Sequence, residues 1–146
     1  MKPIAMRLLL AVGLSACVTG CAAMHNRLQA SSSPCQNTTV TLYFETGSET
    51  LTDAGRQIVG LTAKHLSGCN VRELQLLGLA DPTGSAQTNL TLSQHRADNV
   101  LAAFVKAGLP VPKYTLVAKG QNGAVTASGA IEPVRRQVDA TVVIDR

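Results

Sequence analysis

The chain has 146 residues, a formal net charge of +4 at pH 7 and four aromatic residues, two Tyr and two Phe. This length is enough for one domain with its own core and short extensions. So few aromatic side chains exclude a stacking platform for single-stranded nucleic acid, and the scattered positive charge excludes a basic DNA-binding stripe. We therefore expect no nucleic-acid partner.

The first residues have the composition of an export signal. Lys2 and Arg7 precede an apolar run over 8–14, which is too short to span a bilayer, and small residues follow. The segments 14–17 (LSAC) and 18–21 (VTGC) both resemble the bacterial lipobox, whose cysteine is acylated and becomes the mature N-terminus.

The two lipobox-like segments offer two candidates for acylation. Leu14 at the first motif position favours Cys17. A longer apolar stretch after Arg7, and an even number of cysteines left in the mature chain, favour Cys21. We predict acylation of Cys21, with residues 1–20 as the signal peptide. The alternative is an ordinary signal peptide and a soluble periplasmic product.

Residues 21–37 are polar and have no helical or strand period, which predicts a flexible tether. When extended, about 16 residues span at most about 55 Å, enough to reach from a membrane surface to a nearby wall layer. Three acyl chains would make the anchoring effectively permanent. Ala22, where some lipoproteins have Asp, resembles lipoproteins sorted to the outer membrane. We therefore expect a lipid-anchored outer-membrane protein that faces the periplasm.

A first strand and a first helix follow the tether. β-Branched and aromatic residues over 40–44 predict the strand. Glu45 follows its end, either as a pocket acid or as an ordinary turn residue. Thr52 is the expected N-cap of a helix that stops at Gly68. The expected apolar face of this helix consists of Ile58, Val59, Leu61 and Leu66.

Cys35 and Cys69 remain once Cys21 is acylated. Exported proteins occupy an oxidising compartment, so we expect these two to form a disulfide, worth about 3 to 4 kcal/mol in the chain-entropy model. His65 and Cys69 are four residues apart and could touch one metal ion, but no other ligands complete a site. We expect no metal and no other cofactor.

The middle of the chain predicts a strand, a polar turn and a long helix. Residues 71–80 alternate and then become fully apolar, which predicts a strand that delivers Asp81 to a turn. An amphipathic helix is expected from Asn89 to Ala107, and Arg96 then lies on nearly the same helical face as Asn89. The expected buried side of this helix consists of Leu92, Ala97, Val100, Leu101, Phe104 and Val105.

The C-terminal part predicts two more strands, over 114–118 and 138–144, joined by a loop of small residues over 120–133. The order βαβαβ, loop, β predicts an α/β sandwich, with a mixed four-stranded sheet and both helices packed on one face. Parallel strands end at one edge of such a sheet, where ligand crevices form. That edge would gather Glu45, Asp81, Asn89, Arg96, Arg135 and Arg136.

Asp81 and Arg96 have the chemistry to bind a zwitterionic amino-acid centre. The ammonium of such a centre needs a carboxylate acceptor, and its carboxylate needs a forked guanidinium donor at a fixed separation. From spacing alone, the alternatives are an ion pair between these two side chains and a turn role for Asp81 before Pro82.

Two spaced patterns identify a family. Residues 78–84 read Gly-x-x-Asp-x-x-Gly, and residues 89–100 read Asn-Leu-x-Leu-Ser-x-x-Arg-Ala-x-x-Val. Together they resemble the OmpA C-terminal peptidoglycan-binding family, which includes the peptidoglycan-associated lipoproteins, over residues 38–146. The resemblance implies that Asp81 and Arg96 grip diaminopimelate in the stem peptide of peptidoglycan. Thr83, Asn89 and backbone amides near Leu92 would complete the pocket.

The sequence departs from the family pattern at three places. Glu45 stands where Asp is usual, and Leu79 replaces a His before the pocket acid, so one hydrogen-bonding neighbour is missing. Residues 135–139, Arg-Arg-Gln-Val-Asp, resemble the family's Asn-Arg-Arg-Val-Glu with a shift of one residue, so which of Arg135 and Arg136 matches which family arginine stays open. The family's sheet order, 1-4-2-3, also separates the first two strands by about 9 to 10 Å, so the coil at Cys35 must lean across to reach its partner.

The sequence offers two alternatives to peptidoglycan binding, an enzyme and a protein-binding subunit. Asp81, Ser93 and His95 have the residue types of a hydrolase triad, but Ser93 and His95 are two apart on one helix and cannot face each other. We therefore expect no enzyme. The second alternative is a subunit of an envelope, secretion or motility complex that keeps the fold and binds other envelope proteins.

Overall fold

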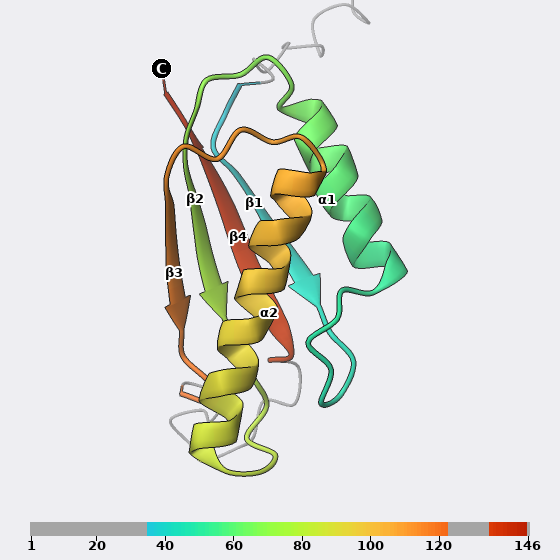
Figure 1. Ribbon diagram of the computed structural model, residues 1–146, viewed down its shortest axis with the longest axis vertical. Helices are drawn as coiled ribbons and strands as arrows, with labels where there is room; N and C mark the ends of the chain where they lie inside the picture. Colours follow the sequence, from blue (N-terminus) through green and yellow to red (C-terminus); the bar gives the residue numbers. More distant parts are fainter. Residues whose placement is uncertain (1–34, 123–134, 146) are drawn as a thin grey trace, which may run out of the picture. The chain divides into compact units, whose positions relative to one another are not determined.

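A four-stranded sheet with two helices on one face makes up the domain (Figure 1). The computed structural model describes residues 35–122 and 135–145. The elements in chain order are β1 (Thr38–Tyr43), α1 (Asp53–His65), β2 (Val71–Gly78), α2 (Ala86–Lys106), β3 (Tyr114–Ala118) and β4 (Gln137–Ile144). The predicted fold class, an α/β sandwich with a mixed sheet, is confirmed.

Several predicted features lie outside the described residues. They are the signal peptide, both lipobox cysteines, residues 21–34 of the expected tether and most of the loop before the last strand. Within the described ranges, no helix is both long and apolar enough to cross a membrane.

The sheet has the order β1-β4-β2-β3, with β4 antiparallel to both of its neighbours and β2 parallel to β3. β1 and β2 therefore run in the same direction. Tyr43 pairs with Gln137 and Gly78 pairs with Val138, so the ends of β1 and β2 flank the beginning of β4. The expected meeting of these three segments at one edge of the sheet is confirmed.

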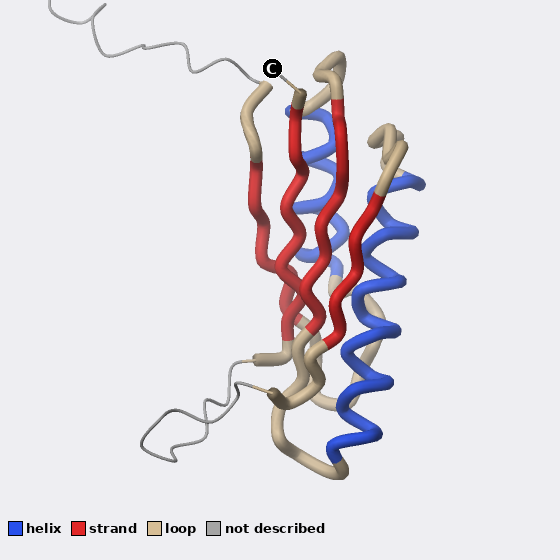
Figure 2. The backbone as a smooth tube through the Cα atoms, turned by 90° about the vertical axis from the view of Figure 1, so that its left-hand side faces the viewer, coloured by secondary structure: helices blue, strands red, loops and turns tan. Residues whose placement is uncertain are grey.

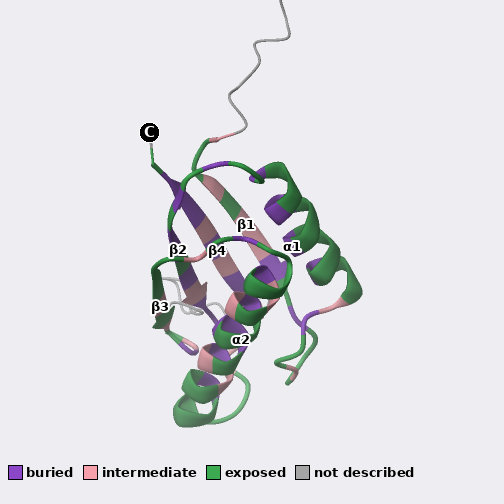
Figure 3. Cartoon of the chain, turned by 45° about the horizontal axis from the view of Figure 1, so that its top comes forward, coloured by how far each residue is buried: buried purple, intermediate pink, exposed green. Residues whose placement is uncertain are grey.

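The core fills the space between the sheet and the helices. Figure 2 shows α2 as a layer beside the strands, and Figure 3 shows buried residues on the helix faces turned toward the sheet. Alternation along each strand sends every second side chain into this layer, because successive residues of a strand face opposite sides. The main fully buried apolar side chains are Leu42, Leu66, Leu74, Val100, Phe104, Val138 and Val142.

Helix α1 begins where the sequence predicts, and its buried face differs from the prediction. The Thr52 hydroxyl caps it by accepting a hydrogen bond from the Gly55 N–H. The residues toward the core are Gly55, Val59, Thr62 and Ala63. Ile58 and Leu61 each lie one residue, about 100°, away from this face and are exposed. The prediction of a buried position was wrong for these two side chains.

Helix α2 begins three residues earlier than predicted. Ser85 is its N-cap, since its hydroxyl accepts a hydrogen bond from the Thr88 N–H at 3.1 Å. The early start places Leu92 in the second turn, where helical N–H groups already bond carbonyl oxygens four residues back. The Leu92 side chain lines the pocket described below, and the role predicted for backbone amides near Leu92 stays a prediction. Val105, expected on the buried side, is exposed as well.

Helix α2 packs unusually close to the end of β2 at Gly78. A Cβ atom at this position would lie 2.2 Å from the Ser93 carbonyl oxygen. On the same helix, the Ser93 hydroxyl donates to the Leu90 carbonyl at 2.8 Å and accepts the Gly120 N–H at 2.9 Å. The close packing of Gly78 against Ser93 holds the next turn of α2, which carries Arg96, beside the edge of the sheet where β1 and β2 end.

The structure contains the predicted disulfide between Cys35 and Cys69, with a Cα–Cα distance of 5.3 Å. The observed sheet order does separate β1 from β2, but both cysteines precede their strands, so coil bridges the gap. Nearby, the Ile144 N–H donates to the Asn37 side chain at 2.9 Å. Residues 35 and 37, which we expected to belong to the tether, are therefore attached to the domain.

Candidate functional site

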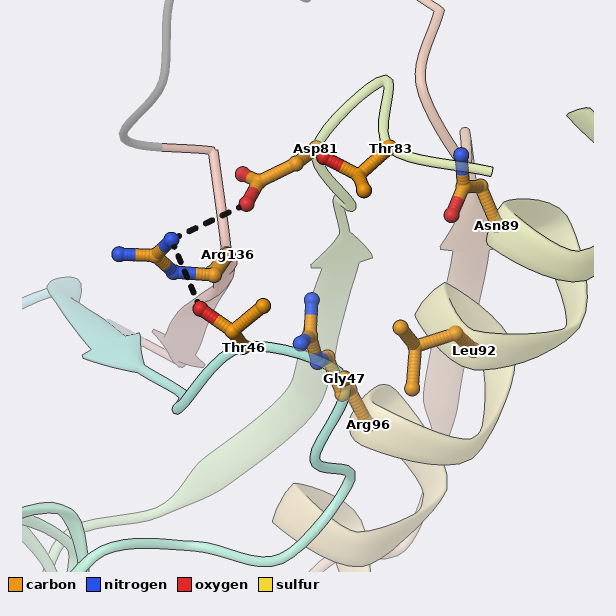
Figure 4. A pocket seen from close by; sticks show the side chains of 8 residues that line it. All are labelled: Thr46, Gly47, Asp81, Thr83, Asn89, Leu92, Arg96 and Arg136. Atoms are coloured by element: carbon orange, nitrogen blue, oxygen red, sulfur yellow. Dashed lines mark hydrogen bonds and ion pairs between the residues drawn. The ribbon is translucent and has the colours of Figure 1, made fainter. Parts of the chain in front are cut away.

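A small pocket lies at the edge of the sheet where β1 and β2 end and β4 begins. Its volume is about 90 Å³. Residues from four segments of the chain converge on it (Figure 4): Thr46, Gly47, Asp81, Thr83, Asn89, Leu92, Arg96 and Arg136.

Arg96 is the most buried charged residue at the pocket, with 1% of its surface exposed. Its guanidinium has five N–H donors. Three of them bond backbone carbonyl oxygens, those of Ser48 at 2.8 Å, Leu79 at 3.2 Å and Glu45 at 3.2 Å. The Phe44 ring centroid lies 5.1 Å from the guanidinium carbon, a cation–π distance. These contacts fix the side chain and leave one N–H on each terminal nitrogen for another partner.

The electrostatics around Arg96 are mixed. Burial lowers the pKa of Arg96, the nearby Asp81 carboxylate raises it, and the Arg136 charge lowers it further. The guanidinium remains charged, because arginine does not lose its proton in proteins. The pocket therefore has two fixed cations and one anion.

Asp81 faces the pocket from the loop that follows β2. Its Oδ2 accepts a hydrogen bond from the Arg136 guanidinium at 3.2 Å, and the same nitrogen donates to the Thr46 hydroxyl at 3.1 Å. The other carboxylate oxygen, Oδ1, is buried and has no hydrogen-bond partner among the described residues. A buried, unpaired carboxylate oxygen is costly, so it marks a place where a donor from a ligand would be favourable.

The ion pair of Asp81 differs from the alternative weighed from the sequence, which paired it with Arg96. Its partner is Arg136, directly before β4. Of the two neighbouring arginines, Arg136 lines the pocket and Arg135 does not. The pairing joins residues 55 positions apart in the chain.

The helix α2 supplies one wall of the pocket. Asn89 is buried, and its amide nitrogen donates to the Gln121 side chain at 2.8 Å, which fixes its orientation. Leu92 contributes its side chain to the wall, and Thr83 closes the pocket from the Asp81 loop (Figure 4). The predicted Asn89, Leu92, Thr83, Asp81 and Arg96 are thus brought together.

The side chain of Glu45, which the sequence offered as a pocket acid or as a turn residue, does not enter the pocket. Its residue is exposed, it does not line the pocket, and its contribution is the carbonyl oxygen that accepts from Arg96. Sequence reasoning missed Thr46 and Gly47 as pocket residues. Gly47 has a φ of 69°, and a Gly four residues after the end of β1 was the available signal for this turn.

The residue types of a hydrolase triad do not meet in the structure. The Ser93 hydroxyl is engaged by Leu90 and Gly120 within the core, as described above, while the His95 side chain is 53% exposed. Its Nδ1 lies 2.8 Å from a Glu49 carboxylate oxygen. Over the described ranges, no three His, Cys, Asp or Glu side chains are grouped so that they could hold a metal ion.

The fold and the pocket define a mixed α/β domain with a small pocket, lined by side chains of both charges, where β1 and β2 end. The chain belongs to the OmpA family, whose model matches residues 43–137. Outer membrane protein A of Yersinia pseudotuberculosis is 36% identical over 76 residues, which are 51% of this chain and 22% of that protein. The aligned part thus spans less than a quarter of that relative.

Solved structures share the fold at low sequence identity. The OmpA-like domain of FopA1 from Francisella tularensis superposes with a TM-score of 0.62 at 18% identity, covering 75% of this chain and 77% of that one. The peptidoglycan-associated lipoprotein from Burkholderia pseudomallei has a TM-score of 0.56 at 21% identity, covering 72% and 89%.

Proposed function

We propose that this protein is an outer-membrane lipoprotein that binds peptidoglycan non-covalently and ties the envelope to the cell wall. The observation that carries the proposal is the buried, unpaired Oδ1 of Asp81, which lies in a pocket with two guanidinium groups. A ligand with an ammonium and a carboxylate on one carbon complements this arrangement. The free end of diaminopimelate in a stem peptide is such a ligand.

Each charged side chain has one part in the proposed binding. Asp81 Oδ1 accepts a hydrogen bond from the ligand ammonium. The remaining N–H groups of Arg96 donate to the ligand carboxylate, and Arg136 neutralises the second oxygen of Asp81. Because Arg96 is already held by three carbonyl oxygens, little side-chain entropy is lost when the ligand binds.

Co-sedimentation of the full-length chain, in detergent, with purified peptidoglycan tests this role. Asp81→Asn keeps the size of the side chain and removes its charge, so we expect it to weaken binding by about 2 to 5 kcal/mol, enough to leave the protein in solution. Asp98→Asn, on the exposed side of α2, is the matched control and should sediment like the wild type. If the wild type stays in solution, a protein-binding role in an envelope complex replaces the proposal.

The lipid anchor is tested by a second experiment. We expect a clickable palmitate analogue to label the chain in cells, and Cys21→Ser to abolish the label. Loss of the label in Cys17→Ser alone would move the anchor to Cys17. If the wild type itself carries no label, the lipid anchor is overturned and the alternative of a soluble periplasmic protein replaces it.

A further inference from the structure

A second, larger hollow adjoins the pocket on the outer side of α2. It has a volume of about 390 Å³ and is lined by Glu49, Gln87, Thr88, Thr91, Leu92 and His95. Leu92 lines both this groove and the pocket, so the two share one wall. A ligand whose head occupies the pocket can therefore continue past Leu92 into the groove.

The pocket and the groove differ in size and in charge. The pocket has a volume of about 90 Å³ and the groove about 390 Å³. Asp81, Arg96 and Arg136 line the pocket and not the groove, so the ammonium and the carboxylate of the ligand belong in the pocket. The part of the ligand that continues past Leu92 meets the larger groove.

The groove offers polar groups that are free to bind. Its helix residues recur at positions 87, 88, 91, 92 and 95, which places them along one face of α2. The side chains of Gln87 and Thr91 make no hydrogen bond within the described part of the chain and are exposed. One amide and one hydroxyl along a helix face can donate to and accept from peptide groups.

The opposite wall of the groove is fixed by two contacts with the loop before α1. The Asn99 side chain donates to the Glu49 carbonyl oxygen at 2.9 Å, and the Glu49 carboxylate lies 2.8 Å from His95 Nδ1. The carboxylate retains lone pairs for a ligand N–H. Because the groove carries this negative charge, it suits neutral peptide amides better than a second free carboxylate.

We propose that this groove is a second subsite that binds the peptide chain next to the zwitterionic head, with Gln87, Thr91, Glu49 and His95 as its polar contacts. The subsite rests on the proposed function, since the head must occupy the pocket first. It makes the protein selective for diaminopimelate that is built into a peptide, compared with the free amino acid.

Isothermal titration of the full-length chain in detergent, with two ligands, tests the subsite. One ligand is free diaminopimelate, and the other is a short stem peptide in which one end of diaminopimelate is part of the chain. We expect the wild type to bind the peptide at least about tenfold more tightly, a difference of about 1.4 kcal/mol. The double variant Gln87→Ala/Thr91→Val should bring this ratio close to one while its affinity for free diaminopimelate stays within about twofold.

Gln57→Ala, an exposed glutamine on α1, is the control and should keep the wild-type ratio. A wild-type ratio near one, or an unchanged ratio in the double variant, overturns the subsite and leaves the pocket proposal standing. Absence of binding to both ligands overturns the subsite and the proposed function together.

Discussion

Arg96 joins α2 to two other segments of the chain, the turn that contains Glu45 and Ser48 and the residue directly after β2, Leu79, through their backbone carbonyl oxygens. A lysine has a single ammonium on a flexible stem and cannot reach three carbonyl groups in a fork. We therefore expect Arg96→Lys to lower the free energy of unfolding by about 2 to 4 kcal/mol, measured by urea unfolding. The control, Arg72→Lys, changes a largely exposed side chain and should stay within about 0.5 kcal/mol. Equal losses in both variants would contradict a structural role for Arg96.

We expect the free energy of unfolding to depend on pH through Glu73. Its carboxylate accepts from the Thr115 hydroxyl at 2.5 Å and from the Gln75 amide at 3.3 Å, and these bonds, the first more strongly, lower the pKa of Glu73 below its ordinary value of 4.5. The unfolded chain therefore binds more protons than the folded chain just below pH 4.5, so stability falls as the pH drops through this range.

Urea unfolding midpoints at about pH 6 and about pH 3.5 would measure the effect. Glu73→Gln has no carboxylate to protonate at this position. We expect this variant to lose less stability than the wild type over the same interval. An identical loss in both proteins would show that Glu73 does not contribute to the acid sensitivity.

At the scale of single residues, the sequence placed Asp81 and Arg96 at one site but not in their actual contacts. Both belong to a spaced pattern, and the spacing determines on which element, and on which face of it, each residue lies. It does not define which of several partners, far apart in the chain, the side chain meets. The pairing of Asp81 with Arg136 depends on the register of β2 against β4. The carbonyl contacts of Arg96 depend on the packing of α2 against the strand ends, and both arrangements become visible only in three dimensions.

Among the elements, the contact between β2 and α2 depends on Gly78. A methyl group there would lie 2.2 Å from the Ser93 carbonyl oxygen, which belongs to helix backbone and has little room to move. We expect Gly78→Ala to destabilise the fold by more than about 3 kcal/mol and to weaken ligand binding, because Arg96 moves with the helix.

The matched variant for this test is Gly60→Ala in α1. A methyl group at Gly60 meets no atom within 4 Å, and alanine is the better helix former. We therefore expect a gain of about 0.5 to 1 kcal/mol in calorimetry or urea unfolding. A neutral Gly78→Ala would show that α2 can shift without cost.

Local sequence signals, such as capping residues and glycines, predicted some helix boundaries and not others. The caps and stops of α1 were predictable because Thr52 and Gly68 act within one turn of the chain. The start of α2 was missed because Ser85 lies in a loop rich in turn residues, where several positions can cap. The buried faces of both helices were only partly right, since Ile58, Leu61 and Val105 are apolar yet face solvent, and periodicity alone does not distinguish adjacent stripes.

For the whole molecule, the disulfide joins two parts of the chain 34 residues apart. In the chain-entropy model such a crosslink contributes about 3 to 4 kcal/mol. We expect the double variant Cys35→Ser/Cys69→Ser to unfold at a correspondingly lower urea concentration. Addition of a reductant should lower the midpoint of the wild type to a similar value and leave the double variant unchanged. A wild type that is insensitive to full reduction would contradict this contribution.

The same disulfide determines how mechanical load would pass through the domain when a tether pulls on its N-terminal side. Without the bond, tension would act first on β1, which is an edge strand and can peel away from β4. With the bond, tension passes from Cys35 through Cys69 into β2, an inner strand that leads to Asp81 at the pocket. Single-molecule pulling on protein bound to immobilised peptidoglycan should show ligand release before unfolding in the oxidised chain, and loss of β1 first in the reduced chain. On the proposed tethering role, the disulfide places Cys69, where the pull of the tether enters, and the pocket residue Asp81 beyond opposite ends of β2, in series.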